Sequence, residues 1–314
     1  MFVNSLRNRD LLSIADLSVE ELRSLIDLSF KLKELYYNGL KYLNILNGKI
    51  VALIFEKHST RTRISLQVAI EQIGGRSLYL SSQELQLARG EPIKDTARVL
   101  DRYVDGVAAR VYSHKSLLEL AEYAKIPVIN ALSDFEHPLQ ALADVMTILE
   151  FKKDMKKVKV AFVGDGRDNV AHSLMLAVTM LGGSIYIATP VGYEPDARLY
   201  NIAKEYAEKS GGYIAIVRDP VEAVKDADVI YTDVWVSMGQ ETERDKRIKD
   251  LKEYQVNKEL VAYAKNDYIF MHCLPAHRGE EVTEDVIESP NSVVWQQAEN
   301  RLHTAKAAIA SILR

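Results

Sequence analysis

Apolar runs and amphipathic patterns alternate along the first half of the chain. A helix is expected to begin after Ser18, which has capping-box spacing to Glu21 and is followed by leucines at helical intervals. Short apolar runs indicate strands at residues 49–55, 77–80, 106–111 and 127–132. Helical patterns lie between or after them, at residues 60–73, 93–103, 117–125 and 137–152. Because apolar strands alternate with helices, we predict a parallel sheet covered on both faces.

The same alternation restarts at Lys157. Strands are expected at residues 158–163, 184–188, 213–217, 229–231 and 268–272, and helices at residues 170–181, 196–210 and 296–314. We therefore predict an α/β protein of two Rossmann-like domains with parallel sheets, linked by two helices. Residues 1–150 should form the first domain and residues 151–295 the second, with the C-terminal helix 296–314 packing back on the first. Ligands in such folds bind beyond the carboxyl ends of the strands.

The composition is that of an ordinary globular protein and narrows the range of partners. The 314 residues are 47% hydrophobic and carry a formal net charge of -4, with acidic and basic residues mixed along the chain. This pattern is not typical of a nucleic-acid patch or a polybasic membrane segment. No apolar run approaches the roughly 20 residues of a membrane span, and residues 1–7 lack the apolar core of a signal peptide. We expect a cytoplasmic protein that binds small molecules and copies of itself, with no nucleic-acid or membrane partner.

Hydroxyl and guanidinium groups cluster after the first predicted strand. Ser59, Thr60, Arg61 and Thr62 stand where the strand passes into a helix. Such a junction presents unpaired backbone N–H groups and the positive end of the helix dipole, and Arg61 adds a planar fork that suits phosphate oxygens. The glycines of a Walker loop are missing, which favours a small phosphate ester or anhydride, bound without a metal, over a nucleotide. Alone, the segment also fits a capped helix with solvated arginines.

A second polar cluster follows the last strand of the first half. His137 and Gln140 are three residues apart near a helix start, so they share one face. The helix dipole disfavours a cationic histidine there, so His137 is expected to be neutral and to donate a hydrogen bond to a carbonyl oxygen. Arg110 ends another predicted strand and should reach the same edge of the sheet. Alone, these residues would be better explained by a helix cap with a packed histidine, and the phosphate motif ahead of them in the same sheet makes that explanation weaker.

In the second half, polar segments also follow predicted strands. Asp233 can pair with an ammonium group, and Ser237 with the backbone near Met238 can hold the other end of an amino acid. Cys273, the single cysteine, fits a nucleophile, a weak polar contact or plain packing, and Leu274 before Pro275 is expected to be extended, with a cis bond as an alternative. The spacing of Cys, His and carboxylate residues around Cys273 does not match a structural zinc site.

The segment 164–169 resembles a dinucleotide fingerprint, but Asn169 stands at the third glycine position. This departure weakens a nicotinamide site and leaves Asn169 as a partner for a carboxylate.

Together these segments resemble the aspartate/ornithine carbamoyltransferase family. The shared stretches occur in order along nearly the whole chain, at residues 55–63, 93–100, 137–140, 233–239, 272–275 and 297–301. S-T-R-T-R and H-P-x-Q belong to both branches of the family, whereas D-x-x-x-S-M-G and H-C-L-P mark the ornithine branch. The resemblance implies transfer of the carbamoyl group of carbamoyl phosphate to the side-chain amine of L-ornithine. The products would be L-citrulline and phosphate, as in arginine biosynthesis, with no cofactor or metal.

The resemblance also implies roles for individual residues. The phosphate would be held by Ser59, Thr60, Arg61 and Thr62. The carbonyl oxygen would be polarised by Thr62, Arg110 and His137. The carbamoyl amide would be held by Gln140 and by main-chain carbonyls near Cys273 and Leu274, with Arg301 reaching into the same site. Ornithine would be bound by Asn169, Asp233, Ser237 and Met238, with Cys273 near the reacting amine. The amine would attack directly, without a covalent intermediate.

Gln86 resembles a residue that the family supplies from a neighbouring subunit, which implies a trimer or an assembly of trimers. The chain departs from the family pattern just after it, where Leu87-Ala88 replaces Leu-Gly or Ile-Gly.

Three other functions share parts of this pattern. A carbamoyltransferase for another amine, such as putrescine or N-acetylornithine, would need the same phosphate site. A nicotinamide-dependent dehydrogenase would also have two Rossmann-like halves, because fold does not determine function. A carbamoyl phosphate-binding or chaperone-like module would lack the amino-acid cluster.

Overall fold

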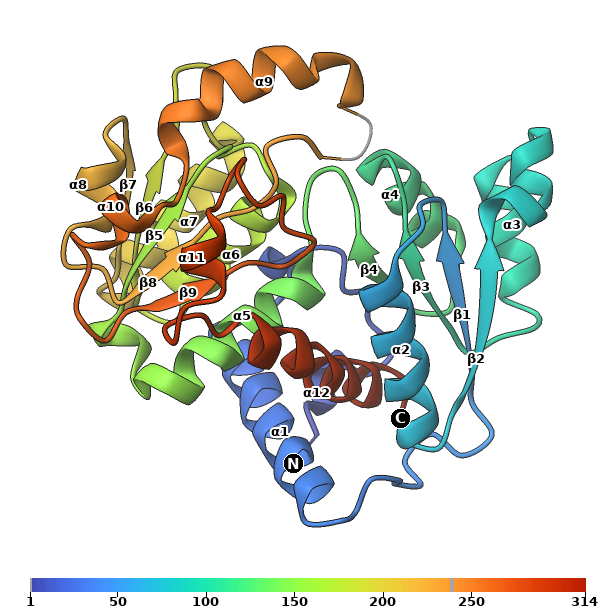
Figure 1. Cartoon of the computed structure of the whole chain (residues 1–314). Coiled ribbons are helices and arrows are strands. Elements are labelled where there is room, and N and C mark those ends of the chain that lie inside the picture. Colours follow the sequence, from blue (N-terminus) through green and yellow to red (C-terminus); the bar gives the residue numbers. More distant parts are fainter. Residues whose placement is uncertain (1, 238–239) are drawn as a thin grey trace. The chain divides into compact units, whose positions relative to one another are not determined.

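The computed structural model describes residues 2–237 and 240–314 and contains two compact units (Figure 1). One unit comprises Met1–Met146 and Glu299–Arg314, and the other comprises Thr147–Ala298. The chain passes from one unit to the other twice, within helices α5 (Pro138–Lys152) and α12 (Val294–Leu313). The predicted fold class, two α/β domains with parallel sheets that are linked by two helices, is confirmed.

The sheet of the first unit has four parallel strands in the order β2-β1-β3-β4. These are β1 (Ile50–Phe55), β2 (Arg76–Ser81), β3 (Gly106–Arg110) and β4 (Val128–Leu132). The chain moves from β1 to β2 on one side and then places β3 on the other side, so the direction of strand addition reverses between β1 and β3. The residue pairs Phe55 with Arg110 and Arg110 with Leu132 lie in register, so these three strands end together at one edge. Such a reversal point is where open α/β sheets bind ligands.

The remaining helices of the first unit are α1 (Val19–Tyr37), α2 (Thr60–Gln72), α3 (Ile93–Leu100) and α4 (His114–Tyr123). The predicted capping box at α1 is present, because Glu21 N–H donates to Ser18 Oγ (3.1 Å) and Ser18 N–H donates to the Glu21 carboxylate (2.9 Å). The C-terminal helix contacts the beginning of the chain. Asn8 N–H donates to the carbonyl of Ile312 (2.9 Å), and Lys33 donates to Asn300 (2.8 Å). The first unit is therefore built from both ends of the sequence.

The sheet of the second unit has five parallel strands in the order β7-β6-β5-β8-β9. These are β5 (Lys159–Val163), β6 (Ser184–Ala188), β7 (Tyr213–Val217), β8 (Val229–Tyr231) and β9 (Ile269–Met271). The reversal point lies between β5 and β8. Phe162, Tyr231 and Met271 are in register across β5, β8 and β9, so the segments that follow these strands leave the same edge.

The long helices of this unit, α6 (Asn169–Met180) and α7 (Ala197–Ser210), lie where they were predicted. Four short helices were not predicted: α8 (Pro220–Val224), α9 (Arg244–Leu251), α10 (Lys258–Val261) and α11 (Glu284–Ile287). They have four to eight residues each, which is too few turns for a periodic apolar pattern.

The seven 3-10 helices of the described chain are Asn4–Leu6, Ile14–Asp16, Ser82–Glu84, Gln86–Arg89, Met155–Lys157, Glu241–Glu243 and Lys252–Tyr254. Among the described residues, none of the helices combines the length and apolar character needed to cross a bilayer.

Candidate active site

The phosphate motif forms the start of α2, directly after β1. Ser59 is the N-cap residue, and its Oγ accepts a hydrogen bond from Thr62 N–H (3.3 Å). The side chain of Arg61 lies half-buried beside it, and its Nε is buried without a hydrogen-bond partner among the described residues. Thr60 is exposed. The segment thus offers a guanidinium donor and the positive end of a 13-residue helix at the reversal point of the sheet.

Arg301, on α12, connects two of the predicted clusters. Its Nη1 donates to Gln140 Oε1 (2.9 Å) on α5, and its Nη2 donates to Thr62 Oγ1 (2.6 Å) on α2. All three side chains are buried, with Gln140 0% and Thr62 1% exposed. Gln140 also donates through Nε2 to Asp144 Oδ1 (2.8 Å), a contact that sequence reasoning missed although Asp144 lies one turn further along α5. Three segments far apart in sequence therefore meet at one guanidinium.

His137 precedes α5 and is 2% exposed. Burial holds the pKa of its imidazole well below the usual value, and the positive charges of Arg301 and Arg110 lower that pKa further. The imidazole is therefore neutral at physiological pH, as predicted. The causes differ from the prediction, because burial and two arginines, rather than the helix dipole, account for the shift. Arg110, at the end of β3, and Arg301 make this edge of the sheet a positively charged, buried environment suited to an anionic ligand.

In the second unit, the segments after β8 and β9 bring Asp233 and Cys273 together. The Cys273 thiol donates to Asp233 Oδ1 (3.1 Å), and Asp233 is 6% exposed. The expectation of an extended Leu274 is wrong. Its φ is +60°, in the left-handed region, and the peptide bond to Pro275 is cis. The buried His272 side chain explains the turn locally, because its Nδ1 accepts the N–H of Leu274 (2.9 Å).

Asp168 is a site residue that the sequence analysis did not select. It is the N-cap residue of α6, where Oδ1 accepts Val170 N–H (2.8 Å), and its Oδ2 accepts a hydrogen bond from Ser237 Oγ (3.2 Å). Its carboxyl group also hydrogen-bonds the carboxyl group of Asp233. The signal was its place at the end of β5, at the reversal point, next to Asn169.

The pair of carboxyl groups, Asp168 and Asp233, titrates unusually because both are buried and close together. Burial and the charge of Asp165 raise the pKa of Asp168 to about 6. Burial and the charge of Asp168 raise the pKa of Asp233 well above its ordinary value. Two adjacent carboxylates repel each other in a medium of low polarity, so the pair retains a proton under conditions that ionise an ordinary aspartate.

The other predicted residues are placed as follows. Asn169 is the first residue of α6 and is half-buried, and Leu274 is half-buried as well. Gln86 begins the 3-10 helix Gln86–Arg89 and is exposed. Met238 lies outside the described residues.

Gly166, in the segment 164–169, has a structural explanation. A Cβ atom on Gly166 would lie 2.8 Å from the carbonyl oxygen of Tyr193 and 2.9 Å from Cδ of Pro195. Gly166 is therefore required by close backbone packing, and no dinucleotide need be invoked to explain it.

Among residues 2–237 and 240–314, two groups of side chains have the composition of a metal site. They are Asp233, His272 and Cys273 in one place and His277, Glu280 and Glu281 in another. In the first group, Nδ1 of His272 accepts Leu274 N–H and Nε2 lies 3.1 Å from Glu281 Oε1, so both imidazole nitrogens already have partners. The donor set is thus less suited to a cation than its composition suggests. The absence of a metal remains a prediction.

Comparison with known proteins identifies the family. The carbamoyl-P binding domain of aspartate/ornithine carbamoyltransferase matches residues 9–150, and the Asp/Orn binding domain matches residues 156–312. The chain is 58% identical over 311 residues to the anabolic ornithine carbamoyltransferase of Pyrococcus furiosus, covering 99% of this chain and 98% of the relative. It is 55% identical over 312 residues to ornithine carbamoyltransferase of Staphylothermus marinus, covering 99% of each.

Solved structures agree. The ornithine carbamoyltransferase from Pyrococcus furiosus superimposes with a TM-score of 0.94 over 98% of each chain at 58% identity. The ornithine transcarbamoylase of Giardia lamblia gives 0.88 over 98% of each chain at 36% identity. The motifs, both sheets and the full-length matches lead to one conclusion: this chain belongs to the aspartate/ornithine carbamoyltransferase family.

Proposed function

We propose that the chain is an ornithine carbamoyltransferase, which converts carbamoyl phosphate and L-ornithine into L-citrulline and phosphate. The observation that carries this proposal is the match to ornithine carbamoyltransferases over almost the full length of both chains. In this proposal, residues 1–150 with the C-terminal helix 296–314 bind carbamoyl phosphate, and residues 151–295 bind ornithine. The polar clusters at the reversal points of the two sheets support this division.

Carbamoyl phosphate is bound by the cluster of the first unit. Its phosphate is held by Ser59, Thr60, Arg61 and Thr62. Its carbonyl oxygen receives hydrogen bonds from Thr62, Arg110 and the neutral imidazole of His137. Its amide is held by Gln140, whose Oε1 keeps one lone pair free while accepting from Arg301, and by main-chain carbonyls near Cys273 and Leu274.

Ornithine is bound by the cluster of the second unit. Its α-ammonium group pairs with the buried carboxyl group of Asp233. Its α-carboxylate receives hydrogen bonds from Asn169, Ser237 and the backbone at Met238. Cys273, which donates its thiol hydrogen to Asp233, lies near the reacting side-chain amine.

The reaction is a direct transfer. A free alkylamine has a pKa of about 10, so the side-chain ammonium of ornithine must lose a proton before it attacks. The neutral amine forms a C–N bond to the carbamoyl carbon, negative charge develops on the carbonyl oxygen, and the C–O bond to phosphate breaks. The leaving phosphate accepts the proton from the new C–N centre. Arg110 and His137 stabilise the developing oxyanion, a contribution typically worth about a hundred- to a thousandfold in rate per donor.

Arg61→Ala should raise the KM for carbamoyl phosphate at least tenfold, because the variant loses the guanidinium donor at the start of α2. The matched control is Arg63→Ala, two residues along the same helix. Arg63 is exposed, and its guanidinium stacks on Tyr79 (3.6 Å to the ring centroid). Steady-state kinetics at saturating ornithine measure the KM for carbamoyl phosphate of both variants. An unchanged KM in Arg61→Ala, or an equal rise in Arg63→Ala, would refute the phosphate assignment.

Cys273→Ser should retain turnover while raising the KM for ornithine. Serine keeps a donor toward Asp233 Oδ1, and direct attack needs no thiol nucleophile. The measurement is citrulline formation against ornithine concentration for wild type and variant. Complete loss of turnover in a folded Cys273→Ser protein would require a covalent mechanism instead.

The choice of amine is tested by product analysis. Wild-type protein with carbamoyl phosphate should form citrulline from ornithine much faster than it carbamoylates putrescine or N-acetylornithine, because only ornithine offers a free α-ammonium and α-carboxylate to the second cluster. Preferential use of putrescine would replace the proposal with a related carbamoyltransferase, and an absence of any carbamoylated product would refute it.

The proposal extends to assembly and cellular role. We place the enzyme in arginine biosynthesis in the cytoplasm, as a homotrimer or an assembly of trimers in which Gln86 acts on a neighbouring site. The anabolic relative supports the role in arginine biosynthesis, and the single cysteine, which excludes an intrachain disulfide, supports the cytoplasmic location. Large apolar side chains exposed on α2, β2 and α3, namely Ile64, Leu78 and Val99, support the second because another copy would bury them. Light scattering of the purified protein measures the assembly.

A further inference from the structure

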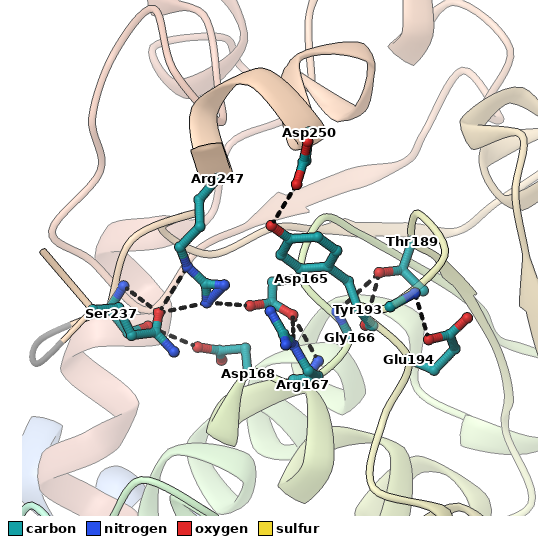
Figure 2. Close-up of polar contacts among 12 residues, drawn as sticks. Asp165, Gly166, Arg167, Asp168, Thr189, Tyr193, Glu194, Ser237, Arg247 and Asp250 are labelled. Atoms are coloured by element: carbon teal, nitrogen blue, oxygen red, sulfur yellow. Dashed lines mark hydrogen bonds and ion pairs between the residues drawn. The ribbon is translucent and has the colours of Figure 1, made fainter. Parts of the chain in front are cut away.

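A buried arginine of the second unit, Arg247, has no role in the function proposed above. Arg247 lies on α9, the short helix that follows the segment carrying Ser237 (Figure 2). It is 1% exposed and is the largest fully buried side chain of the described chain. Six of the eight residues of α9 are charged, yet only Arg247 among these six is buried.

The guanidinium of Arg247 joins two segments that leave the sheet at its reversal point. Its Nη2 lies 2.7 Å from Oδ2 of Asp165, in the segment after β5. The same Nη2 donates to Oε1 of Gln240 (2.5 Å), in the segment after β8, and Nε donates to that oxygen as well (3.2 Å). One side chain therefore holds both segments through charge-assisted hydrogen bonds.

These contacts close into a continuous circuit through the ornithine residues. Two hydrogen bonds join Gln240 to Ser237. Ser237 N–H donates to Gln240 Oε1 (3.1 Å), and Gln240 N–H donates to the carbonyl of Ser237 (3.0 Å). Ser237 Oγ donates to Asp168, and Asp168 N–H donates to the carbonyl of Asp165 (3.1 Å). We call Asp165, Asp168, Ser237, Gln240 and Arg247 the Arg247 network. Figure 2 shows the side chains of Asp165, Asp168, Ser237 and Arg247 close together.

Stability alone does not account for this arrangement. Nη1 of Arg247 is buried and has no hydrogen-bond partner among the described residues, which costs stability. A buried ion pair is in general weak evidence for a stabilising role, since well-packed apolar residues often serve as well. The planar fork of arginine, in contrast, fixes two acceptors at a defined geometry.

We infer that Arg247 is a positioning residue for ornithine: it fixes the segment carrying Ser237 against the segment carrying Asp168 and Asn169, so that the groups that bind the amino acid are held in place. This inference rests on the proposed function. It assigns Arg247 no contact with substrate, and it places the effect on ornithine alone, because all members of the Arg247 network belong to the second unit.

The test compares variants of the full-length protein that separate positioning from anchoring of α9. Arg247→Met removes the fork. Gln240→Met removes the side-chain oxygen that accepts from Ser237 N–H and from Arg247, while the Arg247–Asp165 pair stays intact. Asp250→Asn weakens a different anchor of the same helix, the bond from the Tyr193 hydroxyl to Asp250 Oδ2 (3.0 Å). Lys246→Met changes an exposed neighbour of Arg247. For each, KM is measured for both substrates, with Tm alongside.

Arg247→Met and Gln240→Met should each raise the KM for ornithine tenfold or more while the KM for carbamoyl phosphate stays within twofold. The double variant should be no worse than Arg247→Met, since both act through one circuit. Asp250→Asn and Lys246→Met should keep both KM values within twofold, even where Asp250→Asn lowers Tm.

Equal effects on both substrates, an ornithine KM that follows Tm across all four variants, or an unchanged ornithine KM in Gln240→Met would overturn the inference. Wild type that forms no citrulline would refute the proposed function instead, so the two failures are distinguishable.

Discussion

Replacing Arg301 by methionine is expected to lower kcat/KM for carbamoyl phosphate by about a hundred- to a thousandfold. The change removes the hydrogen bonds that the guanidinium donates to Gln140 (2.9 Å) and Thr62 (2.6 Å), both of which are buried. Methionine fills much of the volume but supplies no donor and no charge. The loss should appear at saturating ornithine, where steady-state kinetics isolate the carbamoyl phosphate site.

The same variant should also change the pH profile. Burial, then the charges of Arg301 and Arg110, hold the pKa of His137 below its usual value. Removing Arg301 raises that pKa, so the neutral imidazole is lost at a higher pH than in wild type. The acidic limb of kcat/KM against pH should therefore move upward, although burial and Arg110 limit the shift. This readout is specific to the site and would not follow from general loss of packing.

Lys306→Met is the matched control for Arg301→Met. Lys306 is a buried cation on the same helix, 2% exposed, and its ammonium stacks on the ring of Tyr36 (4.9 Å) outside the phosphate site. The kcat/KM of Lys306→Met for carbamoyl phosphate should stay within threefold of wild type. If Arg301→Met kept kcat/KM within fivefold, or if Lys306→Met lost as much, Arg301 would have no special role in binding carbamoyl phosphate.

Asp168→Asn should stabilise the protein at neutral pH. The pKa of Asp168 is raised from 3.8 to about 6, so the folded state binds more protons than the unfolded state between those values. Stability is then lost as pH rises through this window, because ionisation is unfavourable in the folded protein. At about 1.4 kcal/mol per pKa unit, the penalty at pH 7 is of the order of 3 kcal/mol. Asparagine cannot ionise, so the variant avoids this free-energy penalty.

The asparagine can keep the helix cap and the hydrogen bond to Asp233, although its Nδ2 cannot accept the hydrogen bond that Ser237 Oγ donates to Asp168. Its Oδ1 can cap α6 as before, and its Nδ2 can donate to Asp233, taking the place of the shared proton. Denaturant unfolding should show the gain at pH 7 and no gain at pH 3.5, where both carboxyl groups are protonated. Asp196→Asn, at the N-cap of α7 in the same unit, is the control and should show no comparable gain. An equal gain in stability at both pH values would contradict the claim that ionisation of Asp168 destabilises the folded protein.

Ligand binding gives the second measurement on Asp168→Asn. L-Norvaline has the carbon skeleton of ornithine without the side-chain amine, so its binding reports only on the α-amino and α-carboxylate ends. In wild type, its affinity should fall between pH 7.5 and pH 5 as the Asp168–Asp233 pair takes up a proton and loses negative charge. In Asp168→Asn the dependence should be flatter, because the repulsion that raises the pKa of Asp233 is removed. A steeper dependence in the variant would contradict this account.

Much of the fold was predictable because each long element carries its own pattern. Most strands are short apolar runs, and the alternation of strands with helices predicted that both sheets would be parallel. The positions of candidate site residues were predictable where a polar motif follows a strand, as at Ser59–Thr62 and Asp233, since such ends gather at one edge of a parallel sheet. The roles of these residues stay predictions.

The remaining features depend on contacts that leave no local pattern. Asp168 and Asp233 are 65 positions apart and pair only because β5 and β8 are neighbours in the sheet. Arg247 lies in a run of charged residues that is typical of a solvated face, and only its burial against Asp165 reveals it. The conformation of Leu274 was mispredicted because the side chain of His272 forms the turn.

The first unit is interrupted in sequence by the whole of the second, and its last segment carries Arg301. During synthesis on a ribosome, the strands β1 to β4 emerge first, yet the guanidinium that joins Thr62 to Gln140 is made only after 300 residues have been translated. A nascent chain can therefore form the sheet early, but Arg301 cannot bond Thr62 and Gln140 until the C-terminal helix has left the exit tunnel. Premature termination anywhere in the second unit would leave a chain that carries S-T-R-T-R but lacks Arg301.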